Sequence, residues 1–61
     1  MSMMYKSQIQ NLLTVLDGKL RVLEGAASGA MKLEPKDVIQ LVHDIRKVSD
    51  RMAELINIER E

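Results

Sequence analysis

His43 is the residue of this sequence best suited to acid–base chemistry, because an imidazole titrates near neutral pH. It is the only histidine, and the chain has no cysteine. Its helical neighbours three and four positions away are an isoleucine, a glutamine and two basic residues, none of which is a carboxylate that would orient the ring. Asp44 follows it directly but is turned about 100° around a helix. We therefore interpret His43 as a solvated surface residue.

Three serines are the remaining candidate nucleophiles. Ser7, Ser28 and Ser49 have no base at a spacing that would activate a hydroxyl, and no glycine-rich phosphate loop is present. No acid, base and nucleophile can be combined into one site. The sequence predicts a non-enzymatic protein with no catalytic residue, cofactor or metal.

A basic set on the second half of the chain is the candidate for nucleic-acid binding: Lys36, Arg46, Lys47 and Arg60. Acidic residues lie between these positions, and nine basic and nine acidic side chains cancel over the whole chain. The single aromatic residue, Tyr5, leaves no platform for stacking bases. This pattern favours a solvated helix face, with nucleic-acid binding as the alternative.

The strongest structural signal is an a/d heptad between residues 35 and 58. Apolar residues there recur at alternating steps of three and four, which predicts a helix with one narrow apolar seam. Pro35 suits the first position of such a helix, because the N–H it lacks would have no partner there. The seam consists of Val38, Leu41, Ile45, Val48, Met52 and Leu55.

A second, less regular series predicts a helix over about residues 3–28. Its a/d positions are Ile9, Leu13, Leu16, Leu20, Leu23, Ala27 and Ala30. Gly25 and Gly29 are the two possible left-handed ends, and we place the end near Ser28. A turn over about residues 29–33 follows. Two helices joined by so short a turn must run antiparallel, so the predicted fold is an all-α helical hairpin over residues 1–61.

The hairpin is too short to hold a sufficient core alone. It has 61 residues, no disulfide and an almost wholly aliphatic composition. Oligomerisation is the remaining means of stabilisation, so we expect a coiled-coil-like homodimer that forms a four-helix bundle. This layout resembles in architecture the Rop family of small plasmid RNA-binding proteins, whose two-helix chains dimerise. The resemblance covers size and heptad layout, and no RNA-contacting motif of that family matches residues here.

Three apolar residues of the first helix lie outside its predicted seam. Leu12, Val15 and Val22 would be exposed on a lone hairpin, and a row of such residues is typical of an interface. We predict that they join the second-helix seam in forming the surface between copies. Docking of a different protein on the same row is the alternative.

The predicted function is that of a small protein-interaction module, either an adaptor, an inhibitor or an assembly factor. Compact chains without cofactors are typical of phage and plasmid accessory proteins. A Rop-like binder of structured nucleic acid is the alternative. No apolar run has the length of a signal peptide core or a membrane span, so we expect a cytoplasmic protein without membrane contact.

Overall fold

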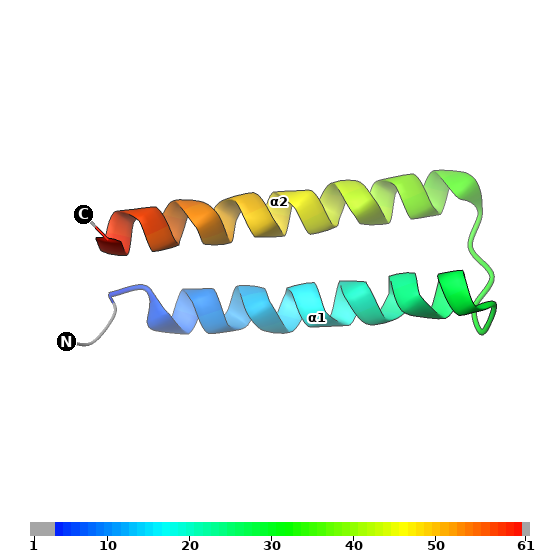
Figure 1. Cartoon of the computed structure of the whole chain (residues 1–61), viewed down its shortest axis with the longest axis horizontal. Helices are drawn as coiled ribbons and strands as arrows, with labels where there is room; N and C mark the ends of the chain where they lie inside the picture. The colour runs from blue at the N-terminus through cyan, green and yellow to red at the C-terminus, as the bar shows by residue number, and fades with distance from the viewer. Residues whose placement is uncertain (1–3, 61) are drawn as a thin grey trace.

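A computed structural model describes residues 4–60 and contains two helices. Helix α1 spans Lys6–Ser28 and helix α2 spans Pro35–Arg60. The helices pack side by side and antiparallel, with the start of α1 and the end of α2 together at one end of the hairpin (Figure 1). The described residues contain no strand. The prediction of an all-helical hairpin is therefore confirmed.

The helix starts follow from local backbone chemistry. At α2 the carbonyl of Glu34 accepts hydrogen bonds from the N–H groups of Asp37 (2.9 Å) and Val38 (3.1 Å). Asp37 lies in the first turn and Arg60 in the last, so each charge opposes the partial charge of its helix end.

Helix α2 ends two residues beyond the predicted position. Helix α1 starts later than predicted, since residues 4 and 5 form a turn; residue 3 lies outside the described residues.

Helix α1 ends at the later of the two glycines that the sequence allows. Gly29 has a left-handed backbone, with φ of 84°, and its N–H donates to the carbonyl of Ala26 at 3.3 Å. The Met31 N–H donates to the carbonyl of Gly25 at 3.0 Å. These two bonds satisfy carbonyls that the helix end would leave without partners.

Two glycine substitutions are expected to change stability in opposite directions. Gly29→Ala places a side chain on a left-handed residue and should lower the free energy of unfolding by about 1 kcal/mol. Gly18 lies within α1 with no atom near the position of an added Cβ, so Gly18→Ala should raise it by about 0.5–1 kcal/mol. Urea titrations followed by circular dichroism measure both. Equal effects of one sign would contradict the assigned helix end.

The hairpin is a single layer of two helices. Its principal dimensions are 44 × 17 × 12 Å, so it is little thicker than one helix. Among residues 4–60 only Ile9 and Leu55 are buried, at 8% and 1% exposed. Both lie near the end of the hairpin where α1 starts and α2 ends, and where the Tyr5 N–H donates to Glu59 Oε1 at 2.6 Å. One layer leaves both broad faces of the hairpin in contact with solvent.

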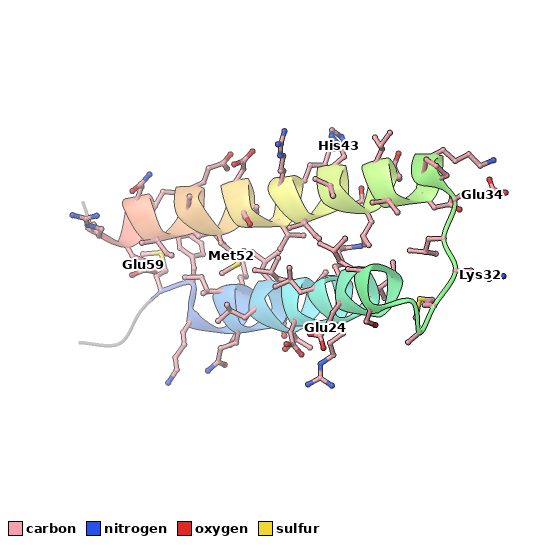
Figure 2. The ribbon with its side chains drawn as sticks, turned by 45° about the vertical axis from the view of Figure 1, so that its right-hand side comes forward. Glu24, Lys32, Glu34, His43, Met52 and Glu59 are labelled. Carbon is pink, nitrogen blue, oxygen red and sulfur yellow. The ribbon has the colours of Figure 1, made fainter. Side chains whose placement is uncertain are left out.

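The packed side of α2 agrees with the predicted seam. All six seam residues, Val38, Leu41, Ile45, Val48, Met52 and Leu55, are buried or half-buried. Met52 lies between the two helices, whereas His43 points away from α1 (Figure 2).

The packed side of α1 differs from the predicted seam and requires a correction. Leu13 and Leu20, predicted to face α2, are 48% and 44% exposed. Ala27 is exposed, and Ala30 lies beyond the helix end. The residues that are covered form a series shifted around the helix: Ile9, Leu12, Leu16, Lys19, Leu23 and Ala26.

An ion pair identifies the direction of this shifted series. Lys19 Nζ lies 3.9 Å from Asp44 Oδ2 of α2, so the Lys19 position faces α2. Leu12 and Ala26 lie seven residues to either side of Lys19 and therefore share its side of the helix. Leu12 thus belongs to the contact within the hairpin and not to a separate row outside it.

Candidate functional site

The two broad faces of the hairpin differ in chemistry, and one of them is the candidate site. Val22 of α1 lines a surface hollow together with Gln40, Leu41 and Asp44 of α2. The side of α1 that carries Val22 and the side of α2 that carries Asp44 therefore form one broad face of the hairpin. Leu13 and Leu20 project from the other side of α1. They therefore share the second broad face of the hairpin with the side of α2 that carries Val38 and Val42.

We name the broad face that carries Leu13, Leu20, Val38 and Val42 the apolar face. It consists of five residues: Leu13 and Leu20 of α1, and Val38, Val42 and Ile56 of α2. The two leucines are one heptad apart, and Ile56 follows Val42 by two heptads, so each helix contributes one continuous row. Leu13, Leu20 and Ile56 count among the exposed large hydrophobic residues, while the two valines are half-buried. Aligned rows of this kind mark an interaction surface.

We name the opposite surface the polar face, because charged groups cross its middle. The Lys19–Asp44 ion pair bridges the two helices there, and Gln40 Nε2 donates to Asp44 Oδ1 at 3.0 Å. Val15 and Val22 flank this pair on α1. Covering this face with an apolar partner would remove the ion pair from water at a cost in free energy. The apolar face carries no such pair among the described residues.

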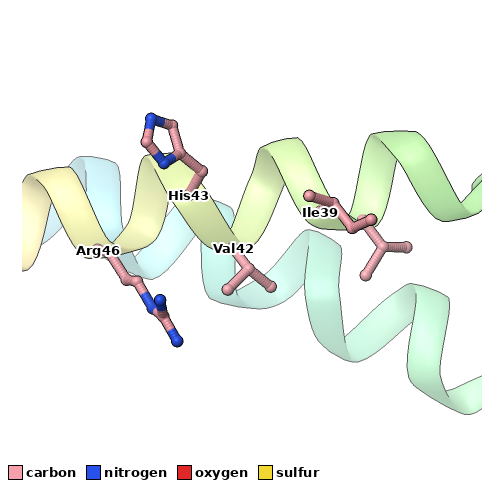
Figure 3. Close-up of a pocket in the computed structure, with 5 residues that line it drawn as sticks. Ile39, Val42, His43 and Arg46 are labelled. Atoms are coloured by element: carbon pink, nitrogen blue, oxygen red, sulfur yellow. The ribbon is translucent and has the colours of Figure 1, made fainter.

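A shallow groove adjoins the apolar face along α2. Its volume is about 320 Å³, and it is lined by Val38, Ile39, Val42, His43 and Arg46. Val42 and Arg46 project to the same side of α2, while His43 projects to the other side (Figure 3). Arg46 has no ion-pair partner among the described residues, although its spacing to Asp50 permits one.

Side chains suited to metal binding are dispersed over the described residues 4–60. No group of three or more histidine or acidic side chains lies close enough to hold a metal ion. Ser28 donates its hydroxyl to the carbonyl of Gly25 at 3.2 Å, which is a helix-end contact. His43 is exposed at the margin of the groove.

The basic residues considered for nucleic acid do not gather on one patch. Lys36 and Arg60 lie at opposite ends of α2, about 36 Å apart along a helix with a rise of 1.5 Å per residue. Lys36 Nζ lies 3.6 Å from Glu34 Oε2, which offsets its charge. Arg46 and Lys47 are adjacent in sequence and therefore project about 100° apart.

The three residues predicted to lie outside the hairpin contact are separated by the structure. Leu12 is half-buried in the contact between the helices, while Val15, 46% exposed, and the half-buried Val22 lie together on the polar face. Leu13 and Leu20, which sequence periodicity placed inside, form a second exposed row. Leu12 is thus inside the contact and Leu13 outside it, the reverse of the prediction. The two leucines are adjacent, and each continues a row of three- and four-residue steps, so periodicity alone does not distinguish them.

Comparison with protein-family models, with curated proteins and with solved structures finds no match for this chain. Neither α1 nor α2, within residues 4–60, carries an apolar stretch of the length that a membrane crossing requires.

Proposed function

We propose that this protein is a small, non-enzymatic protein-interaction module that acts as a homodimer through its apolar face. The observation that carries the proposal is the single-layer hairpin, with two buried residues among 4–60 and one face on which exposed and half-buried apolar residues form aligned rows. A stable domain needs at least two packed layers around its core. A second copy provides the second layer and completes a four-helix bundle.

The accessible surface supports the same proposal. The chain exposes 5004 Å². A compact monomer of 6.9 kDa is expected to expose about 4,000 Å². The excess of about 1,000 Å² is close to the roughly 800 Å² per partner that a stable interface buries. A homodimer therefore removes about as much surface as the hairpin has in excess.

Coupling of folding to assembly gives the test of this proposal. The melting temperature followed by circular dichroism should rise with protein concentration, by several degrees over a hundredfold range. Light scattering after size exclusion should give twice the mass of the chain. A monomer mass with a melting temperature independent of concentration would contradict the homodimer.

The role of the assembled module is adaptor, inhibitor or assembly factor for another protein, and a purification from native extract tests this second half. Another protein should remain bound at a salt concentration that strips nucleic acid from basic surfaces. Retention of RNA or DNA that falls steeply as salt rises would instead support the nucleic-acid alternative, through Lys36, Arg46, Lys47 and Arg60.

A further inference from the structure

We propose that two copies pack so that α1 of each lies on α2 of the other, with Asp17 paired to the partner's Arg46. This inference rests on the proposed homodimer and specifies the geometry of its interface. Asp17 lies four residues after Leu13, and Arg46 lies four residues after Val42. Each charge therefore borders the outer margin of the apolar face, one on each helix.

The register of the hairpin places the two charges at the same level along the helix axis. Tyr5 meets Glu59 through a hydrogen bond, and Lys19 meets Asp44 through an ion pair. In both pairs the residue numbers add to nearly the same value, as antiparallel helices require. By this register Asp17 lies level with Arg46, near the middle of both helices.

Two symmetric arrangements cover the apolar face with a second copy. A two-fold axis parallel to the helices places α1 on the partner's α2 and keeps each residue at its own level. Asp17 then lies beside the partner's Arg46 on both sides of the dimer. A two-fold axis across the helices places α1 on the partner's α1, which brings the two Asp17 carboxylates together. Like charges repel, so the charge pattern favours the first arrangement.

The apolar residues fit the favoured arrangement. Leu20 lies level with residues 43 and 44, next to the groove that Val38, Ile39 and Val42 line. In the dimer with α1 on the partner's α2, Leu20 enters that groove on the other chain. Arg46 at the margin of the groove, without an ion-pair partner in residues 4–60, is then free to approach Asp17.

Charge reversal tests this pairing. Asp17→Arg and Arg46→Asp should each raise the dimer dissociation constant by roughly tenfold, because each variant creates two like-charge contacts per dimer. The double variant should return to within about threefold of the original value. Arg46→Asp cannot restore the local ion pair of Asp17 with Arg21, so recovery in the double variant reports only on the contact between chains. Additive losses in the double variant would contradict the pairing.

Cysteine cross-linking provides an independent test, since the chain has no cysteine of its own. After mixing and oxidation, Asp17→Cys with Arg46→Cys should give a disulfide-linked heterodimer, and neither variant alone should be linked efficiently. Self-linking of Asp17→Cys in a dimer of the expected mass would overturn the arrangement and leave the homodimer intact. A monomer mass for the unmodified chain would overturn the homodimer itself.

Discussion

Leu55→Ala is expected to unfold the hairpin at 25 °C. Leu55 is 1% exposed and is the largest fully buried side chain among residues 4–60. Its truncation removes apolar burial and leaves a cavity, at a cost of about 2–5 kcal/mol. A single core in a chain of this length rarely supplies more than about 3–5 kcal/mol. One substitution therefore removes most of the free energy of unfolding.

Urea or thermal unfolding followed by circular dichroism measures the effect of Leu55→Ala. Ile58→Ala is the control on the same helix, because Ile58 is 49% exposed and lies outside the seam, the apolar face and the groove, so its truncation should change stability by less than about 0.5 kcal/mol. Comparable losses in the two variants would show that the assigned packed side of α2 is wrong. Ile45→Ala, at a half-buried position, should fall between them.

The second large effect is expected from Leu20→Glu on the apolar face. In a homodimer this substitution buries a carboxylate in an apolar interface without a partner, which costs several kcal/mol. The dimer should dissociate, and helicity should fall with it because one layer of helices cannot hold a core. Size exclusion with light scattering, together with circular dichroism, measures mass and helicity in the same sample.

Val15→Glu is a closely matched control for Leu20→Glu. Val15 is 46% exposed and Leu20 is 44% exposed, and both lie on α1. They differ in the face that they occupy, since Val15 flanks the Lys19–Asp44 ion pair on the polar face. Val15→Glu should preserve mass and helicity. If Val15→Glu dissociates the dimer and the Leu20→Glu protein remains dimeric, the interface lies on the polar face. That is the interface that sequence periodicity alone predicts.

Much of the hairpin was predictable from local chemistry. The α2 seam has one apolar residue at each a and d position and polar residues over most of the remaining surface, so only one side of this helix is able to pack. Pro35 marks the start of α2 because it lacks an N–H, and Gly29 marks the end of α1 because it adopts a left-handed φ. Both properties belong to the residue itself and depend little on tertiary contacts. Such signals depend on a few adjacent residues.

Local patterns were sufficient to predict two helices, their antiparallel order and the packed side of α2. Which side of α1 meets α2, and hence which broad face is apolar, became clear only from the packing of the two helices. The apolar arc of α1 is wide, with neighbours such as Leu12 and Leu13 that each continue a row of three- and four-residue steps. The choice between these rows depends on the direction in which the turn places α2. It also depends on apolar packing between residues distant in sequence, and the Lys19–Asp44 ion pair and the hydrogen bond from Tyr5 to Glu59 are long-range contacts that accompany this packing.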